Sequence, residues 1–204
     1  SDGIPGWPWN DNSTEKPEEP DVTEPKPRYI WIDAAANFPD YANNKENIAK
    51  DMAKIKAAGF TDIIVDVRPT TGDVLFNTDV VDQVKRMDVW GNSGYSYYER
   101  TETWDYLQAF IDEARKQELK VNASINTFVG GYLCPYNLGH DGVLFRDDSK
   151  KGWASVANLA DGLTNTMDLL DDGVDYGAKF FNPANDDVQN FVLQLLADLA
   201  KYDL

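Results

Sequence analysis

The order and spacing of the apolar segments restrict the fold of this chain more than any other feature. Short apolar runs in "RYIWIDA", "TDIIVDV" and "KVNASIN" predict strands, and apolar residues with the 3.6-residue period of a helix follow each of them. The predicted helices cover residues 43–60, 102–119 and 182–201. Strands and helices in alternation are typical of parallel βαβ units, so we expect an α/β fold with a parallel sheet.

The connections between these elements differ in length. Each helix leads almost at once into the next strand, whereas the connections from strand to helix run from Arg68 to about Glu102 and from Thr127 to Asn182. In βα barrels and open α/β sheets the carboxyl ends of the strands carry the active or binding site. The extra length on this side indicates a functional surface there, and we expect short strands or helical turns inside the long loops.

Capping residues set the expected helix starts. Asn43 or Asn44 can cap the first helix and Thr103 the second, because their side-chain oxygens can accept a free N–H of the first turn. Asn182 is expected to cap the third, since Pro183 follows at a position where a missing N–H costs nothing.

Charge and composition exclude several functions. The net charge of −16 argues against nucleic acid and against an anionic membrane surface, whereas a neutral carbohydrate partner is compatible with it. No apolar run is long enough to span a bilayer. With one cysteine, Cys134, and one histidine, His140, neither an internal disulfide nor a Cys/His zinc site is expected. The acidic segment 168–177 lacks the spacing of a calcium loop, so no metal and no cofactor is expected.

Residues 1–27 differ in composition from the rest. The stretch "NDNSTEKPEEPDVTEPKP" is rich in Pro and Glu and has few apolar residues, which predicts a disordered, extended linker. Residues 28–204 are expected to form the folded domain.

Polar residues gather at the ends of the predicted strands. Because side chains alternate along a strand, those on one side of each strand converge on a common mouth. The candidate substrate-binding residues at these ends are Asp33, Asp66, Arg68, Asn122 and Asn126, with Ser124 between the two asparagines. The alternative is an ion pair of Arg68 with Asp66 or Asp33 that only orients the loops.

Aromatic residues are frequent in the long loops. Flat rings with hydrogen-bonding rims suit the faces of sugars. Most of these rings are expected to pack the loops onto the sheet. Trp90 and Trp153, with Gly, Asp and Asn nearby, are the candidates for ligand contact.

Three segments, "DIIVDVRPTTGDVLF", "VNASIN" and "FFNPANDDVQNFVLQLLADLAKYDL", resemble the glycosyl hydrolase-like family 10 proteins, which are TIM-barrel proteins of the α-amylase-like type. The resemblance covers roughly residues 28–204. The residues that match the family motifs are Arg68, Pro69, Gly72 and Asp73 after the second strand, Asn126 in the third, and Asn182 and Pro183 before the last helix. At the third strand, Asn122 and Ser124 stand where the family has His and Trp.

This resemblance implies a parallel (βα)8 TIM barrel, of which the chain supplies about the first three βα units and ends at the fourth strand. It implies a glycoside hydrolase acting on a polysaccharide or oligosaccharide, and it adds Asp73 to the candidate substrate-binding residues. Glycoside hydrolysis uses a pair of carboxyl groups. The family's candidate acid follows the position of Leu204, so the chain is expected to lack the catalytic carboxylates and to be inactive alone.

Two alternatives stay open. The chain could be a non-catalytic carbohydrate- or cell-wall-binding module, or part of a scaffold that pairs with a second chain, which predicts a homo-oligomer. Its Pro/Glu-rich start also resembles the tether of bacterial surface lipoproteins. That resemblance implies an extracytoplasmic location, at the bacterial cell surface or in the periplasm, with a lipid anchor as the sole membrane attachment.

Overall fold

The computed structural model describes residues 26–134, 139–169 and 177–204. Almost all of the predicted linker, and residues 170–176 of the acidic segment, lie outside these ranges. Among the described residues, no helix is both long enough and apolar enough to cross a bilayer.

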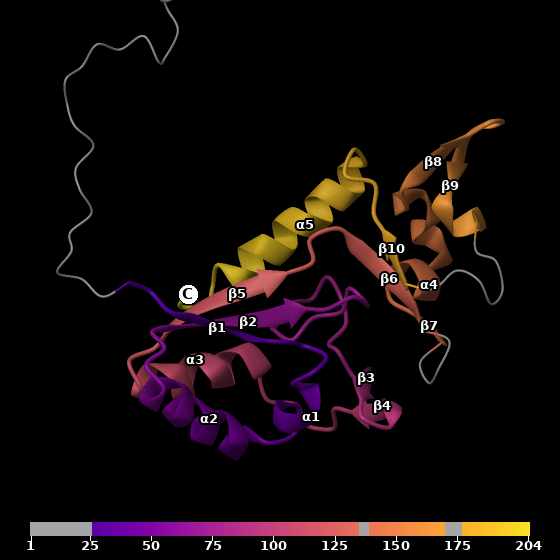
Figure 1. The fold of residues 1–204 in the computed structure, drawn as a ribbon. Coiled ribbons are helices and arrows are strands. Elements are labelled where there is room, and N and C mark those ends of the chain that lie inside the picture. Colours follow the sequence, from indigo (N-terminus) through magenta and orange to yellow (C-terminus); the bar gives the residue numbers. More distant parts are fainter. Residues whose placement is uncertain (1–25, 135–138, 170–176) are drawn as a thin grey trace, which may run out of the picture.

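The fold is mixed α/β with a small parallel sheet, as the sequence predicts (Figure 1). Its strands are β1 (Tyr29–Ile32), β2 (Asp62–Arg68) and β5 (Lys120–Ile125), in the order β1-β2-β5. Helices α2 (Lys45–Ala57) and α3 (Tyr106–Lys116) connect them and lie together on one side of the sheet.

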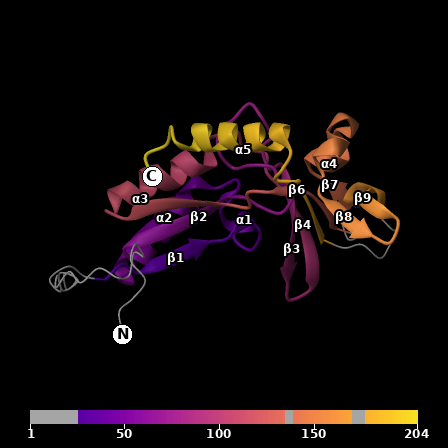
Figure 2. The ribbon, with the colours of Figure 1, turned by 90° about the horizontal axis from the view of Figure 1, so that it is seen from above.

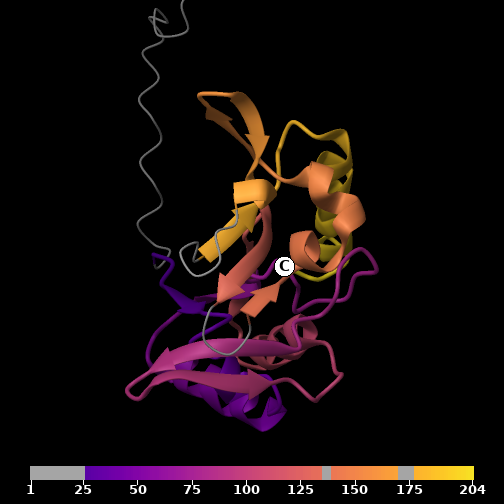
Figure 3. The same cartoon turned by 90° about the vertical axis from the view of Figure 1, so that its right-hand side faces the viewer.

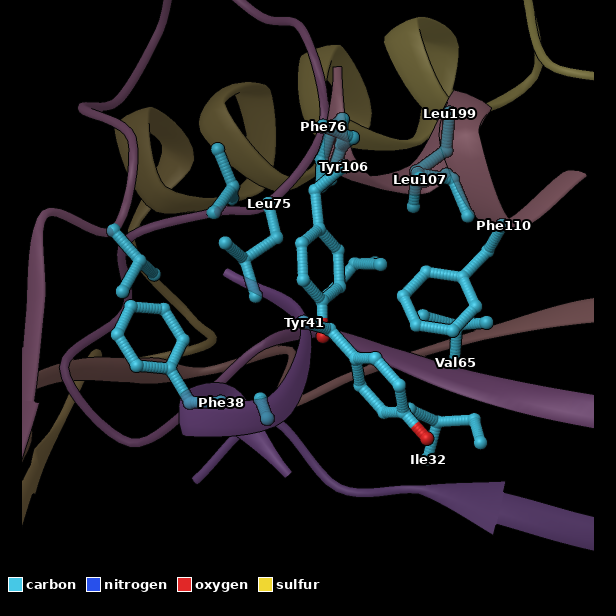
Figure 4. Close-up of a cluster of buried hydrophobic side chains, with 14 of the residues drawn as sticks. Ile32, Phe38, Tyr41, Val65, Leu75, Phe76, Tyr106, Leu107, Phe110 and Leu199 are labelled. Atoms are coloured by element: carbon cyan, nitrogen blue, oxygen red, sulfur yellow. The ribbon is translucent and has the colours of Figure 1, made fainter. Parts of the chain in front are cut away.

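The core lies between the sheet and these helices. The sheet contributes the buried side chains Ile32, Ile63, Val65, Val67 and Val121, and the helices contribute Ile48, Met52, Leu107, Phe110 and Ile111. Figure 4 shows Phe110 beside Val65, with Tyr41 and Tyr106 close by. The rings of Tyr41 and Phe110 meet edge to face, with centroids 5.2 Å apart. Burial of this apolar surface is the main stabilising term.

Much of the opposite face of the sheet is uncovered among the described residues. Trp31, Ile64 and Asn122 stand side by side across the three strands. Trp31 is 57% exposed. We call this the open face. In the part of the chain that the structure describes, no strand pairs with the outer edge of β1 or of β5.

Two of the predicted helix starts are wrong. Helix α3 begins after Asp105, not Thr103, because the Asp105 carboxylate accepts the N–H of Gln108. Helix α5 (Asp186–Leu199) begins after Asn185, whose side chain accepts the N–H groups of Asp187 and Val188. Asn182 forms an earlier turn instead. The cap of α2 is Asn44, one of the two expected.

Helix α5 ends beside α3 (Figure 2). Arg115 of α3 forms an ion pair with Asp203, at 2.7 Å, and the Tyr202 hydroxyl donates to the Asp105 carboxylate at 2.5 Å. Buried α5 side chains, among them Val188, Phe191 and Leu195, complete the core.

The long loops contain short elements, as expected. Between β2 and α3 lies a hairpin of β3 (Arg86–Gly91) and β4 (Gly94–Glu99). The elements between β5 and α5 are β6 (Val129–Cys134), β7 (Gly139–Asp141), α4 (Val143–Arg146), β8 (Val156–Leu159), β9 (Gly162–Asn165) and β10 (Gly177–Phe180). Short helices also lie at Phe38–Tyr41 (α1), Asp148–Trp153 and Thr166–Leu169. Figure 3 shows the β8–β9 hairpin projecting from this insert.

Candidate functional site

Arg68, at the end of β2, ties together the two long loops. Its side chain is completely buried. Its guanidinium donates to the main-chain oxygens of Gly72 (2.8 Å) and Val129 (2.6 Å), and also to those of Asn126 and Thr127. Burial lowers the pKa of Arg68 to about 10, although the charge of Asp73 acts to raise it. Within the described residues Arg68 has no ion pair, so its donors are directed to the loops.

The conformation of Gly72 explains why Gly72 and Asp73 follow Arg68 and Pro69 so closely in the sequence. The φ angle of Gly72 is +83°, a region that residues with a side chain rarely adopt. A Cβ atom there would lie 2.9 Å from Arg68 Nη2 and 3.0 Å from the Val129 oxygen. The glycine lets the chain turn closely around the guanidinium and delivers Asp73 to the adjoining cavity.

Asp33 and Asp66 hold the loop that follows β1. The Asp33 carboxylate accepts the N–H groups of Ala35 and Ala36, at 2.7 and 2.6 Å. Burial raises the pKa of Asp66, and the negative charge of Asp33 adds to this rise. The main-chain N–H groups of Ala34 and Arg68 donate to the Asp66 carboxylate and partly oppose the rise. The structure therefore brings the two carboxylates near each other, at adjacent strand ends.

The two candidate asparagines lie on β5 and just after it. Asn122 is exposed on the open face, and its amide donates to the Ile63 oxygen at 3.2 Å. Asn126 is also exposed, and its main-chain N–H donates to the Arg68 oxygen at 3.2 Å. Neither side chain lines the cavities described below.

One face of the β3–β4 hairpin combines rings with charged groups. Directly opposed residues of an antiparallel pair share a face. The pairs on this hairpin face are Arg86 with Glu99, Asp88 with Tyr97, and Trp90 with Tyr95. Trp90 is 69% exposed, and its ring meets that of Tyr95 with centroids 4.9 Å apart. The face presents flat rings beside hydrogen-bonding groups, an arrangement suited to sugars.

A cavity of about 430 Å³ borders this face. We call it the hairpin cavity. Its lining residues are Asp73, Gln83, Lys85, Arg86, Tyr97, Glu99, Arg100, Asp141 and Arg146.

Arg146, at the end of α4, links the segments around the hairpin cavity. It binds Asp73 through both terminal nitrogens, one of them 2.9 Å from Oδ2, and it contacts Asp141 at 3.3 Å. Asp141 in turn accepts from Arg86 of β3, at 3.4 Å. Burial acts to lower the pKa of Arg146, but the hydrogen bond and charge of Asp73 outweigh it and raise that pKa. This network holds the hairpin, the Gly72–Asp73 turn and the β7–α4 segment together.

A smaller cavity, of about 130 Å³, lies between the hairpin and the strand ends. Its lining residues are Ala35, Thr70, Thr71, Met87, Asp88, Tyr95 and Tyr132. The hairpin face therefore borders two cavities, one on the charged network and one at the ends of β1 and β2.

Trp153 lies away from both cavities. Its ring packs edge to face against Phe181 and Phe191, with centroids 5.8 and 5.7 Å away, and the Lys150 ammonium lies over it. The structure thus brings Asp73 to the hairpin cavity and Trp90 to its hairpin, and it separates Trp153 from them.

Several residues of the site are not among those predicted from the sequence. Arg86, Asp88, Asp141 and Arg146 come from inserts whose internal pairing has no sequence signal strong enough to align them. The described residues contain no group of three or more His, Cys, Asp or Glu side chains placed to hold a metal ion.

No protein-family model matches the chain. An S-layer-related protein of Niallia circulans is 27% identical to it over 184 residues, a match that covers 86% of this chain and 10% of that protein. The chain therefore spans about a tenth of the length of this relative.

Proposed function

We propose that the chain forms part of a glycoside hydrolase-like barrel, of the glycosyl hydrolase-like family 10 type, and that its hairpin face binds the carbohydrate. The observation that carries the proposal is the exposed Trp90 on a face that also presents Tyr95 and Tyr97 to two cavities. Rings and polar groups of this kind bind sugars by stacking on their C–H surfaces and bonding their hydroxyls.

The barrel is supported by the way the sheet is covered. Helices pack against one face, whereas the open face, with Trp31 and Asn122, is exposed in the described part of the chain. A closed (βα)8 barrel would cover this face and pair the outer edges of β1 and β5. All long inserts lie at the carboxyl ends of the strands, where such barrels carry their sites.

A location at the bacterial cell surface is supported by the S-layer-related relative. Carbohydrates are abundant ligands in that setting, and they need no basic protein surface, in keeping with the net charge of −16.

A second candidate is a non-catalytic carbohydrate-binding module. The observation in its favour is that Asp33, Arg68 and Asp73 are all engaged in holding loops. We expect the catalytic carboxylates to lie outside these residues, as the resemblance implies, and the chain alone to bind carbohydrate without hydrolysing it. Release of reducing ends by the purified chain would contradict this expectation.

Trp90→Ala tests the binding proposal. Because Trp90 is largely exposed, the variant should keep its fold and lose affinity for a soluble polysaccharide by about tenfold, as truncation of an aromatic anchor typically does. Affinity electrophoresis or calorimetry with a polysaccharide panel measures this.

Leu163→Ala is the matched control. Leu163 is 74% exposed on the β8–β9 hairpin, so its loss should leave binding unchanged. Equal affinities in wild type and Trp90→Ala, or no binding to any polysaccharide of the panel, would rule out the proposed role.

A further inference from the structure

The charges that line the hairpin cavity differ in balance from the rest of the chain. The chain as a whole carries 35 acidic and 19 basic residues. The cavity lining reverses this ratio, with Lys85, Arg86, Arg100 and Arg146 against Asp73, Glu99 and Asp141. A cluster of cations in an acidic protein attracts an anionic group to that one place.

The carboxylates of the cavity are already engaged by the protein. Asp73 is gripped by both terminal nitrogens of Arg146. Asp141 accepts from Arg146, from Arg86 and from the N–H of Gly142, the last at 2.8 Å. Glu99 accepts the Tyr97 hydroxyl at 2.7 Å. Asp73 and Asp141 therefore have little acceptor capacity left for a cation from outside, and one oxygen of Glu99 is engaged as well.

Two of the cations, by contrast, are available. The Lys85 ammonium is exposed and has no hydrogen-bond or ion-pair partner in the described ranges. Arg86 reaches Asp141 through two contacts of 3.4 Å, which are long for charged hydrogen bonds. It also interacts with the Tyr97 hydroxyl, and its side chain is 40% exposed. Both groups can therefore donate to a better-placed acceptor.

A ring lies on the same hairpin face as Arg86. Tyr97 is 41% exposed and lies two residues from Glu99 toward the hairpin turn, on the same face as the Arg86–Glu99 pair. Trp90 and Tyr95 continue this face beyond Tyr97. A sugar that stacks on Tyr97 would direct the substituents at its rim toward Arg86 and Lys85.

We propose that the hairpin cavity is a subsite for an acidic sugar, a pyranose that carries a carboxylate, with Lys85 and Arg86 binding the carboxylate and Tyr97 supporting the ring. This inference rests on the proposed carbohydrate-binding function and specifies the class of sugar. A volume of about 430 Å³ suits one or two sugar units rather than a long segment of chain.

The test compares acidic glycans with their neutral counterparts. Calorimetry on the full chain uses oligogalacturonate and oligomannuronate, each beside a sample whose carboxylates have been reduced to hydroxymethyl groups. We expect at least one acidic oligosaccharide to bind about tenfold more tightly than its reduced form, and this preference to shrink as salt rises.

Lys85→Gln should remove most of this preference, because it should lower the affinity for the acidic oligosaccharide much more than that for the reduced one. The matched control is Lys50→Gln, which removes an exposed charge from α2 and should leave both affinities unchanged. Equal losses in the two variants would mean long-range attraction only and would overturn the inference.

The remaining outcomes separate the inference from the function on which it rests. Binding of acidic and reduced oligosaccharides with equal affinity would overturn the acidic subsite and leave carbohydrate binding in place. Binding of neither, together with no effect of Trp90→Ala on any polysaccharide, would overturn the proposed function itself. Full displacement of the oligosaccharide by an equal concentration of inorganic sulfate would show an anion site that does not recognise the sugar, which also contradicts the inference.

Discussion

A single guanidinium, that of Arg68, holds the carboxyl side of the sheet together without a carboxylate partner among the described residues. Its hydrogen bonds go to four main-chain oxygens from two loops, and its plane lies over the rings of Phe181 and Phe191 at 5.9 and 5.6 Å. With its pKa at about 10, Arg68 stays protonated at neutral pH in spite of its burial. Its position makes it a determinant of loop geometry.

Arg68→Lys should therefore lower the stability of the fold. An ammonium cannot reproduce the fork that reaches Gly72 and Val129 at once, so buried carbonyl oxygens lose their donors. We expect the free energy of unfolding, measured by urea denaturation, to fall by about 3 kcal/mol. The control is Arg115→Lys, at a half-exposed side chain of α3, which should change the free energy of unfolding by less than about 0.5 kcal/mol. Equal stability of Arg68→Lys and wild type would refute this account.

The position of Asp73 could be predicted from the sequence, but its partner could not. The motif spacing singles out Asp73, but its partner Arg146 lies 73 residues away, in an insert without regular periodicity. An ion pair between two loops leaves no repeating pattern in the sequence. Trp90 and Trp153 are similar in their sequence context, yet the structure exposes one and packs the other against Phe181.

Helix α5 is fastened near its carboxyl end to the loop that follows Phe76. The Asp198 carboxylate accepts the Thr78 hydroxyl at 2.6 Å, the Lys201 ammonium at 3.0 Å and the Gln194 amide at 3.3 Å. The Thr78 hydrogen bond, followed by that of Lys201, lowers the pKa of Asp198. A carboxyl group whose pKa is lower in the folded state stabilises the fold above its unfolded pKa, and this contribution is lost as the pH falls through the folded value.

Thr78→Val should show this pH dependence. The variant loses the hydroxyl donor, so the pKa of Asp198 should rise and the melting temperature at pH 7 should fall. The difference from wild type should shrink as the pH falls through the lowered pKa of Asp198, because the carboxyl group is then protonated in both chains. Thermal unfolding at several pH values measures this, with Thr103→Val as the control at an exposed threonine. A difference that stays constant down to pH 2.5 would contradict the assignment.

The parallel strands and their helices could be predicted because their apolar periodicity spans whole elements. The start of α5 could not, since Asn182, Asn185 and Asp186 near it all have side chains able to cap. Pro183, directly after Asn182, favoured the earlier start. In the structure Asn182 belongs to a turn instead, and its main-chain N–H donates to the Trp153 oxygen. The candidate caps of α5 are equivalent in their local sequence, and contacts with the rest of the fold determine that Asn185 is the one used.

In the part of the chain that the structure describes, helices cover one face of the parallel sheet, and much of the other face is exposed. Tyr29 and Trp31, both more than half exposed, stand on the open face, where Ile64 of β2 lies between Trp31 and Asn122. An apolar sheet surface with unpaired edges favours association.

We therefore expect the chain to associate with itself in 0.15 M salt, where repulsion between its negative charges is screened beyond about 8 Å. Sedimentation velocity should show a mass that rises with concentration. Trp31→Lys should shift this rise to about tenfold higher concentration, because it removes a large apolar contact. Leu163→Lys, which alters an exposed leucine on the β8–β9 hairpin, should not. A constant monomer mass at all concentrations would count against association through the open face.

The buried guanidinium of Arg68 also has a consequence for the order of events in folding. Its acceptors are as many as 61 residues away in sequence, on a loop that must close before they are in place. Until then the charge is better solvated by water, so we expect the contacts of Arg68 to form late, after the rate-limiting step. Interactions formed so late leave the folding rate unchanged and slow unfolding. In a chevron plot Arg68→Lys should therefore raise the unfolding rate and leave the folding rate unchanged, so Arg68 lengthens the lifetime of the native state.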